Sequence, residues 1–393
     1  MSELNYLEKL LDGTEVEWKA LGDVTSVLRG KRLTKNLLSA EEKFPVFHGG
    51  LEPLGYYNKS NRPANTVMII NVGASAGTVG YSTVDFWSSD GCFCLEHNEL
   101  LNNRFLYFAL IGYQSLLKSK VRVAGIPTLD AIVVNKLLIP IPCPENPEKS
   151  LAIQSEIVRI LDKFTALTAE LTAELTAELN MRKKQYNYYR DQLLSFKDGE
   201  VEWKTLGEVA QYSKTRISFE LLDERNYVGV DNLLQNRAGK SLSNHVPTSG
   251  KLTEFIPTDI LIGNIRPYLK KIWQADCIGG TNGDVLVIRC IDSSINTRYL
   301  YQILADDKFF EYNMQHAKGA KMPRGSKEDI MKYPIPVPPL TLQARIVEIL
   351  NKFDTLTNSI TEGLPREIEL RQKQYEYYRD LLFSFPKPET ASN

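Results

Sequence analysis

Hydrophobic residues recur along this chain with two different periods, which separate helical regions from strand-rich ones. Between Leu151 and Phe196 there is no proline or glycine, and apolar residues recur three and four positions apart. They are Ile157, Ile160, Leu161, Phe164, Leu167, Leu171 and Leu175. This spacing predicts a long helix over 151–196 and, by the same pattern, a second over about 342–385. Gly363 and Pro365 predict a kink or break in the second helix.

Short β-type runs fill the regions 25–135 and 210–330. The clearest runs are 66–72 and 284–290, each close to glycines, which is typical of strands bounded by turns. The two regions share almost no sequence identity. They nevertheless occupy the same place between matching flanks, so we expect two domains of one fold with two separate specificities.

Those flanks are an internal duplication, the strongest signal in the chain. Val-Glu-Trp-Lys-x-Leu-Gly occurs at 16–22 and 201–207, and Pro-Ile-Pro at 140–142 and 334–336. Two further motifs recur at one common offset of 189 positions: Ile-Val-x-Ile-Leu-x-Lys-Phe, at 157–164 and 346–353, and Gln-Tyr-x-Tyr-Tyr-Arg-Asp, at 185–191 and 374–380. Four ordered matches predict one structural frame used twice.

The duplication is circular. Residues 6–13, before the first matched motif, are similar to the run 193–199 before the second. The N-terminus therefore begins part-way through a unit that the C-terminus completes, and we expect close chain ends and a pseudo-twofold relation. The predicted division is residues 1–150 and 198–340 for the two domains, 151–197 for a central helix, and 341–393 for a distal helix and tail.

Three tandem Thr-Ala-Glu-Leu copies occupy 168–179 of the first helix. A leucine at every fourth position forms one ridge, which suits packing against another long helix. We expect the two long helices to pair as an antiparallel coiled coil. The alternative is a solvated helix that is rich in good helix-forming residues.

Charge and hydropathy narrow the class of protein. Lys plus Arg total 47 against 48 for Asp plus Glu, which excludes a globally basic nucleic-acid binder but not local basic patches. No apolar run approaches a membrane span, and Glu3 and Glu8 do not fit a signal peptide. We expect a cytoplasmic protein that does not bind membranes.

The cysteines predict no disulfide framework, because their number, five, is odd and their spacing is irregular. Cys92 and Cys94, with His97 close behind, raise the possibility of a metal site. A tetrahedral site needs further ligands at comparable spacing, and none is present. Two buried strand thiols facing the same way is the favoured interpretation, so no metal ligands are assigned.

No motif indicates catalysis. The glycine-rich run 73–80 lacks the Lys-Ser/Thr of a phosphate loop and predicts a strand–loop–strand turn. The Glu-x-Lys pairs at 17–19 and 202–204 have nuclease-like spacing but lack an acidic partner after a strand. There is no nucleophile arrangement and no adenine-methyltransferase motif. We therefore assign no catalytic residue.

Basic and amide side chains cluster within the two strand-rich regions. Lys and Arg contact phosphates, whereas Arg, Asn and Gln read base edges, so these residues are candidate DNA contacts. Three of them, at 118–122, alternate as one face of a strand would. The alternative is an ordinary solvated charged surface. The candidates are Arg29, Lys31, Arg32, Lys35, Lys118, Lys120, Arg122, Asn264, Arg266, Lys270, Lys271, Lys318, Lys321 and Arg324.

Along essentially its whole length the sequence resembles the specificity subunits of type I restriction–modification enzymes. The repeated Val-Glu-Trp-Lys-x-Leu-Gly motif, the Pro-Ile-Pro motif before a helix, and Asp-Ile-Leu at 259–261 leading into Arg266-Pro267 carry this resemblance. The Thr-Ala-Glu-Leu repeats beside Gln-Tyr-x-Tyr-Tyr-Arg-Asp resemble one subfamily. The resemblance implies an α+β fold with two α/β target recognition domains separated by two conserved antiparallel spacer helices.

The same resemblance implies a non-catalytic subunit that reads a bipartite, asymmetric double-stranded DNA target. Two methyltransferase subunits and restriction/translocase subunits are the implied partners, and S-adenosylmethionine, ATP and Mg belong to them. The setting would be bacterial phage defence, in the cytoplasm and on the nucleoid. The rival hypotheses are a coiled-coil scaffold that joins two protein-binding domains without touching DNA, and a self-contained methyltransferase or nuclease, which the missing motifs disfavour.

Overall fold

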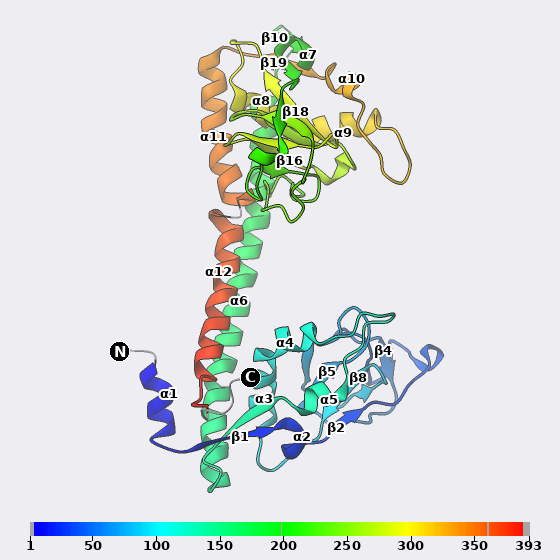
Figure 1. Cartoon of the computed structure of the whole chain (residues 1–393), viewed down its shortest axis with the longest axis vertical. Helices are drawn as coiled ribbons and strands as arrows, with labels where there is room; N and C mark the ends of the chain where they lie inside the picture. The colour runs from blue at the N-terminus through cyan, green and yellow to red at the C-terminus, as the bar shows by residue number, and fades with distance from the viewer. Residues whose placement is uncertain (1–3, 198, 360, 388–393) are drawn as a thin grey trace. The chain divides into compact units, whose positions relative to one another are not determined.

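The computed structural model describes residues 4–197, 199–359 and 361–387. It divides into two compact units (Figure 1). Unit 1 comprises residues 1–170 and 372–393, and unit 2 comprises residues 171–371. Leu7 and Leu11, near the beginning of the chain, share one apolar core with Leu382 and Phe385, near its end, so the circular organisation expected from the sequence is confirmed.

In unit 1, the duplicated motifs frame the domain by pairing with each other. Strand β1 (Val16–Ala20) carries the Val-Glu-Trp-Lys motif and pairs antiparallel with β9 (Leu138–Pro142), which carries Pro-Ile-Pro. Helices α2 (Leu21–Val24) and α5 (Ala131–Asn135) adjoin this ribbon. The backbone N–H of Leu21 donates to the carbonyl of Leu137 at 2.7 Å. The first and last segments of the domain are therefore fastened together.

Between the framing strands of unit 1 lie two sheets and a helix. The larger sheet has the order β2-β8-β5-β6 and the smaller β4-β3-β7, in which β3 and β7 are parallel. Helix α3 (Asn103–Gly112) lies against β5 and β6. The strand bounds are β2 (Val27–Arg29), β3 (Phe44–Phe47), β4 (Gly55–Tyr57), β5 (Thr66–Ile70), β6 (Val79–Ser82), β7 (Trp87–Ser88) and β8 (Cys92–Leu95).

Strand β5 shows how the layers form. Val67 and Ile69 belong to a core shared with α3 and the long helix α6, whereas Met68 and Ile70 belong to a second apolar cluster with Phe47 and Phe86. Alternate side chains of a strand point to opposite faces, so β5 is buried on both sides. The strand predicted over 66–72 is confirmed. The run 73–80 contains the predicted turn between antiparallel β5 and β6, and its last two residues begin β6.

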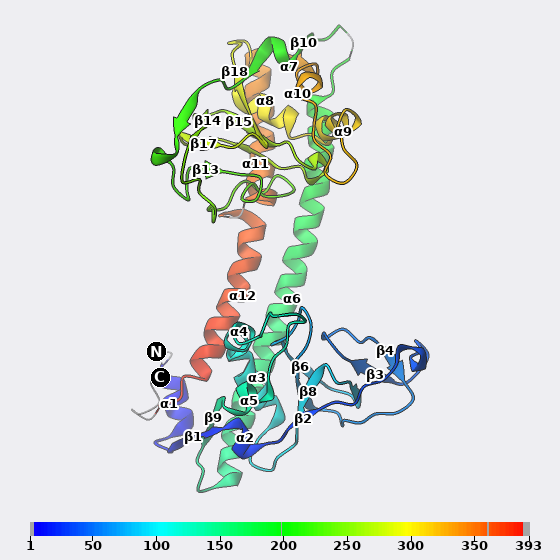
Figure 2. The ribbon, with the colours of Figure 1, turned by 45° about the vertical axis from the view of Figure 1, so that its right-hand side comes forward.

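Unit 2 repeats the framing ribbon and the strand order of the larger sheet, whereas its second sheet has four strands among the described residues in place of three. Strand β10 (Glu202–Thr205) pairs with β19 (Pro334–Val337), and the larger sheet has the order β11-β18-β15-β16. The second sheet, β12-β14-β17-β13, again contains one parallel pair, β13 with β17 (Figure 2). The expectation of two domains of one fold is confirmed, although their sequences differ.

The remaining elements of unit 2 have the following bounds: α7 (Leu206–Val209), β11 (Ala210–Tyr212), β12 (Arg216–Ser218), β13 (Tyr227–Val228), β14 (Lys251–Phe255), β15 (Ile260–Gly263), β16 (Ile272–Gln274), β17 (Gly279–Thr281), β18 (Val285–Cys290), α8 (Thr297–Leu304), α9 (Asp307–Gln315) and α10 (Lys327–Ile330).

The other two duplicated motifs, Ile-Val-x-Ile-Leu-x-Lys-Phe and Gln-Tyr-x-Tyr-Tyr-Arg-Asp, lie on three helices. Helix α6 (Pro147–Leu194) is continuous and begins at a proline, which the first turn of a helix tolerates. The second helix is divided into α11 (Leu340–Asn358) and α12 (Gly363–Leu382). Gly363 has a φ of 77°, which favours glycine, and Pro365 lies in the first turn of α12. The predicted break is confirmed.

Equivalent aromatic pairs join the helices within each unit. In unit 1 the rings of Phe164 on α6 and Tyr378 on α12 are stacked at 5.4 Å, and the two segments run antiparallel (Figure 1). In unit 2 the rings of Tyr189 on α6 and Phe353 on α11 are stacked at the same 5.4 Å. These four residues hold matching positions in the duplicated motifs. The expected antiparallel pairing is present in each unit.

One predicted strand is wrong. Lys118 lies in helix α4 (Gln114–Ser119), Lys120 follows its end, and only Arg122 has extended pairing. Tyr113, Leu117 and Val121 all pack against the core of unit 1, and Leu117 is fully buried. Their spacing of four residues is helical, so burial of this apolar face overrides the alternation of the three cations.

Candidate nucleic-acid interface

Two short hairpins lie at equivalent places in the two units. Hairpin 1 is residues 122–128 and hairpin 2 is residues 318–324. Arg122 and Thr128 exchange backbone hydrogen bonds of 2.9 and 3.0 Å, and Lys318 and Arg324 exchange two of 2.9 Å. The segment that contains hairpin 2, between α9 and α10, projects from unit 2 as an open loop (Figure 1).

A buried asparagine supports the base of each hairpin. The carbonyl of Asn71, 3% exposed, accepts from the N–H of Leu129 at 2.9 Å. The carbonyl of Asn264, 7% exposed, accepts from the N–H of Gly325 at 3.1 Å. Each asparagine directly follows a central strand of its larger sheet, β5 in unit 1 and β15 in unit 2. The hairpins are therefore fixed to wholly buried strands.

A second anchor lies two residues further along the chain. The N–H of Gly73 donates to the carbonyl of Pro127 at 2.9 Å, and the N–H of Arg266 donates to that of Pro323 at 2.7 Å. Both donors have positive φ, 88° for Gly73 and 53° for Arg266. A positive φ is uncommon for a residue with a Cβ, so the backbone at Arg266 is held by its surroundings.

Five of the predicted contacts therefore meet at hairpin 2. Arg266 is half-buried and its Nε has no hydrogen-bond partner, whereas Lys318, Lys321 and Arg324 of hairpin 2 are exposed. Arg324 pairs with Asp284 at 3.0 Å while remaining 57% exposed. The five residues are Asn264, Arg266, Lys318, Lys321 and Arg324.

Lys270 and Lys271 are turned away from this cluster into internal contacts. Lys270 and Arg237 both pair with Asp307, and Lys270 Nζ lies 2.8 Å from its carboxylate. Burial pushes the pKa of Asp307 upward, but the hydrogen bond from Lys270 and the Arg237 charge outweigh it and lower that pKa. Lys271 is 8% exposed and its ammonium donates to the Val230 carbonyl, while burial lowers its pKa. The expectation that Lys271 is a surface cation is wrong.

In unit 1 the predicted cations form two groups. Arg29, Lys31, Arg32 and Lys35 are exposed along the segment from β2 to a short 3-10 helix (Lys35–Leu37). Trp87 Nε1 donates to the carbonyl of Lys31 at 2.8 Å, so this segment is fastened to the smaller sheet. Lys118 and Lys120 are exposed at the end of α4, and Arg122 pairs with Asp130 at 2.8 Å while 68% exposed.

Sequence reasoning named Arg122 but missed the correspondence of the two hairpins. Their sequences are Arg-Val-Ala-Gly-Ile-Pro-Thr and Lys-Gly-Ala-Lys-Met-Pro-Arg. A basic first residue, a shared alanine and an apolar residue before proline are the signal that would have aligned them. That signal is short, and the unlike sequences on either side conceal it.

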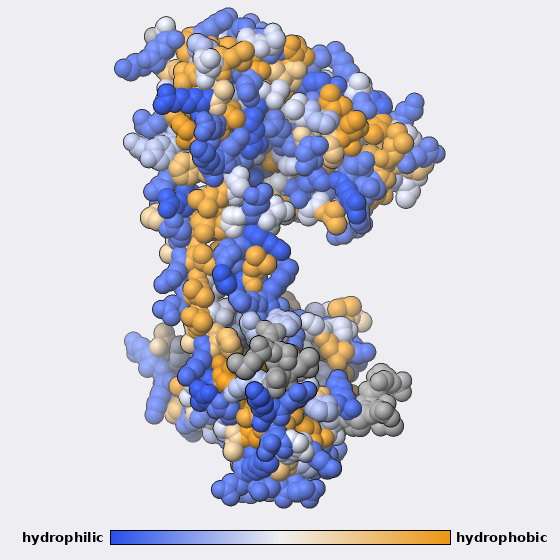
Figure 3. Space-filling view, turned by 90° about the vertical axis from the view of Figure 1, so that its left-hand side faces the viewer, coloured by the Kyte–Doolittle hydropathy of each residue, from blue (hydrophilic) through white to orange (hydrophobic). Residues whose placement is uncertain are grey.

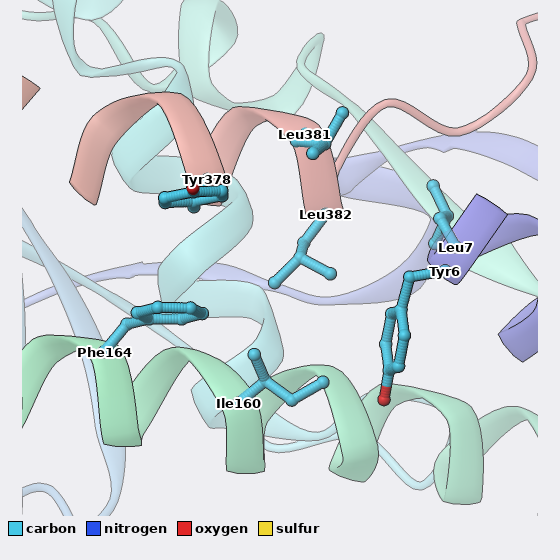
Figure 4. Close-up of a pocket in the computed structure, with 7 residues that line it drawn as sticks. All are labelled: Tyr6, Leu7, Ile160, Phe164, Tyr378, Leu381 and Leu382. Atoms are coloured by element: carbon cyan, nitrogen blue, oxygen red, sulfur yellow. The ribbon is translucent and has the colours of Figure 1, made fainter. Parts of the chain in front are cut away.

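Two further features of unit 1 are a pair of buried cysteines and an apolar pocket. Cys92 and Cys94 are fully buried on one face of β8, as predicted, and their shared hydrogen bond together with burial raises the pKa of Cys92. A pocket of about 340 Å³ in unit 1 is lined by apolar and aromatic side chains from α1 (Leu4–Leu11), α6 and α12 (Figure 4). In it Phe164 and Tyr378 face each other, and such a lining suits an apolar side chain.

Within the described ranges, no cluster of three or more His, Cys, Asp or Glu residues has a geometry that would hold a metal ion. The helices of those ranges are also too short or too polar to cross a membrane.

Comparison with known proteins gives a consistent result over both halves of the chain. The family model for the type I restriction modification DNA specificity domain matches residues 14–181 and again 199–370. The chain is 42% identical to the type I restriction enzyme EcoR124I/EcoR124II specificity subunit of Escherichia coli, over 100% of both chains. It is 35% identical to the EcoprrI specificity subunit of the same organism, over 92% of this chain and 93% of that one.

Solved structures are similar in fold. The S subunit of a type I restriction–modification system from M. genitalium has a TM-score of 0.51 at 19% identity, covering 96% of this chain and 98% of that one. A chain from a structural study of complex assembly and conformational transition in a type I system has a TM-score of 0.54 at 17% identity, covering 94% and 96%.

Proposed function

This chain belongs to the family of type I restriction enzyme specificity subunits, and from that premise we propose that it reads a bipartite, asymmetric DNA target for its complex. Each unit would read one half-site. The observation that carries this proposal is the pair of hairpins, which have the same anchors in both units but different side chains. Because the backbone anchors are the same and the side chains differ, the two hairpins are suited to recognise two different DNA sequences with one backbone arrangement.

The chemistry of the cations supports contact with DNA. Exposed Lys and Arg side chains neutralise phosphates, and Arg and Asn read base edges. In unit 2 the exposed Lys318, Lys321 and Arg324 lie around the half-buried Arg266 and the buried Asn264. The outer residues are suited to phosphates, and Arg266 to a base edge. Lys270 and Lys271 are not among the proposed DNA contacts, because Lys270 pairs with Asp307 and Lys271 donates to a backbone carbonyl within the domain.

In this proposal the chain has no catalytic step of its own. Methyl transfer with S-adenosylmethionine, and ATP- and Mg-dependent translocation and cleavage, belong to the methyltransferase and restriction subunits.

Hydrophobic surface gathers along the helical segment on the face shown in Figure 3. Met181 on α6 is 46% exposed and Leu370 on α12 is 41% exposed. We assign this helical surface to docking of the methyltransferase subunits.

Salt-dependent DNA affinity tests the proposal against a protein-binding scaffold. The chain in complex with its methyltransferase subunits is titrated with duplex DNA at increasing salt concentration. Phosphate contacts release counterions, so the logarithm of the affinity should fall linearly with the logarithm of salt, with a slope of about −0.9 for each contacted phosphate. A scaffold adds nothing to the affinity of the methyltransferase subunits alone, and that outcome would refute DNA recognition by this chain.

A further inference from the structure

An exposed apolar side chain occupies the same position in both hairpins. Ile126 in hairpin 1 is 71% exposed, and Met322 in hairpin 2 is 48% exposed. Each directly precedes the proline, Pro127 or Pro323, whose carbonyl fastens the hairpin to the central sheet. Single exposed apolar residues are common on protein surfaces and need no explanation. This pair needs an explanation, because an exposed apolar residue occupies the equivalent position in both units.

Apart from the shared alanine and proline, the positions around this apolar residue differ between the two hairpins. Between the first and last residues of the hairpins, Val123 corresponds to Gly319 and Gly125 to Lys321, and the last residues, Thr128 and Arg324, also differ. Both hairpins have an apolar residue before the proline, although this residue is exposed and the buried core does not require it. A residue that is apolar, exposed and rigidly supported in two divergent domains fits contact with a ligand.

The groove of DNA supplies a ligand of the right shape. The major groove, about 12 Å wide, admits a two-stranded ribbon. Each hairpin is a short loop whose two ends are held side by side by one pair of backbone hydrogen bonds, and we take it to enter the groove in the same way. Cations at the first position of both hairpins, Arg122 and Lys318, would contact the phosphates at the groove edge. The apolar side chain then faces base edges, where the thymine 5-methyl group is the apolar feature.

Resting on the proposed function, we propose that Ile126 and Met322 enter the major groove and contact a thymine methyl group, one in each half-site. The two side chains thereby make these hairpins specificity elements rather than only phosphate-binding loops. The flexible methionine side chain adapts to its contact, whereas the β-branched isoleucine is stiffer. Unit 2 should therefore tolerate a shifted methyl group better than unit 1.

Replacing thymine by uracil tests this contact, because uracil lacks only the methyl group. Affinity of the complex with its methyltransferase subunits is measured for the target duplex and for duplexes with single thymine-to-uracil changes. For the wild-type complex, one change in each half-site should weaken binding by about fourfold, the contribution of one buried methyl group. Ile126→Ala should abolish that sensitivity in one half-site only, and Met322→Ala in the other only.

Matched controls are Val84→Ala in unit 1, 53% exposed, and Leu221→Ala in unit 2, 68% exposed. Both should keep the wild-type response to uracil, and thermal unfolding should be the same for all four variants. Equal sensitivity to uracil in wild type and hairpin variants would overturn the inference, as would half-sites that contain no thymine. A wild-type complex without sequence preference would instead contradict the proposed function, and the inference with it.

Discussion

Arg266 combines a strained backbone with an unsatisfied side chain. Its φ of 53° is unusual for a residue with a Cβ, and its Nε is buried without a hydrogen-bond partner. Its N–H meanwhile fastens hairpin 2. Strain of this kind persists only where the surroundings enforce it and often occurs at binding sites. We interpret Arg266 as a base-reading side chain presented from a fixed backbone.

Arg266→Ala should therefore weaken specific binding by about 1–3 kcal/mol and relax one base position in the half-site read by unit 2. Arg266→Gly should weaken binding equally while leaving the fold as stable or more so, because glycine accepts positive φ. Affinity for a panel of single-base variants of the target, with parallel thermal unfolding, separates the two effects. Uniform weakening on all sequences would make Arg266 a phosphate contact instead.

Two fully buried glutamines tie the helices to the domains. Gln154 on α6 accepts from the N–H of Asn102 at 2.8 Å and donates to the carbonyl of Leu100 at 2.9 Å. Gln343 on α11 makes the same pair of bonds with Asn296 and Ser294, both at 2.8 Å. These bonds satisfy the backbone just before α3 and α8.

Gln154→Ala or Gln343→Ala should lower the free energy of unfolding by about 1–3 kcal/mol for each backbone group left unpaired. The exposed Gln192→Ala on α6 is the control and should change it by less than about 0.5 kcal/mol. Chemical denaturation of the three variants measures the differences. The bases recognised should stay the same, and a changed target would show that these glutamines do more than join helix to domain.

At the residue scale, sequence reasoning grouped side chains that lie close together in the fold, and their contact with DNA stays a prediction. It grouped Asn264 and Arg266 with 318–324 as DNA-contact candidates, and the structure brings them together. It failed for Lys271, because the burial of that ammonium depends on the Val230 carbonyl, which belongs to a turn 41 positions earlier in the chain. Composition carries no information about such a contact.

At the scale of elements, the long helices were the most predictable. The predicted 151–196 corresponds to α6 (Pro147–Leu194), and the break was placed correctly from Gly363 and Pro365. The short helix α4 was missed because only one turn carries its apolar face. Short elements have too few residues to establish a period, so chance alternation of charges competes with it.

The Thr-Ala-Glu-Leu repeats lie wholly inside α6 and suggest a molecular ruler. One repeat adds about 6 Å of rise and about 400° of rotation, 40° beyond a full turn. One base pair advances about 3.4 Å and rotates about 35°. The rotation thus matches one base pair, and the rise matches nearly two.

Deleting one repeat, residues 172–175, should therefore shorten the unspecified spacer of the target by one base pair, or two at most, without altering either half-site. The second helix must tolerate the change, and its break between α11 and α12 is the place for it. Sites modified by the two-repeat and three-repeat proteins are mapped and compared. An unchanged spacer, or new half-site bases, would contradict the ruler.

At the scale of the molecule, the duplicated motifs predicted the frame, while the topology of the inserts could not be predicted. The sheets β2-β8-β5-β6 and β11-β18-β15-β16 are equivalent although their sequences share almost nothing. Buried strands require only apolar residues at suitable positions, so many sequences satisfy one topology. The frame is recognisable because Trp18, Gln154 and their counterparts make particular contacts in both halves.

The boundaries between the duplicated motifs and the inserts also define segments that can be exchanged between relatives. Residues 25–135 begin after α2 and end with α5, outside the β1–β9 ribbon. Replacing them by the same region of a relative should change one half-site and preserve the other, provided that the residue bound by Gln154 keeps its backbone position. Methylation mapping of the chimera tests this modularity. A change in both half-sites would show that the units do not read independently.

The central claim is that two units of one fold read two different half-sites. The most direct measurement is the map of methylated bases in the genome of a host that carries this chain with its methyltransferase. If the two units read different half-sites, the map contains one bipartite motif with two unlike specific halves separated by an unspecified spacer of fixed length, and the motif is lost when this chain is deleted. A continuous or symmetric motif, or methylation that persists without the chain, would contradict it.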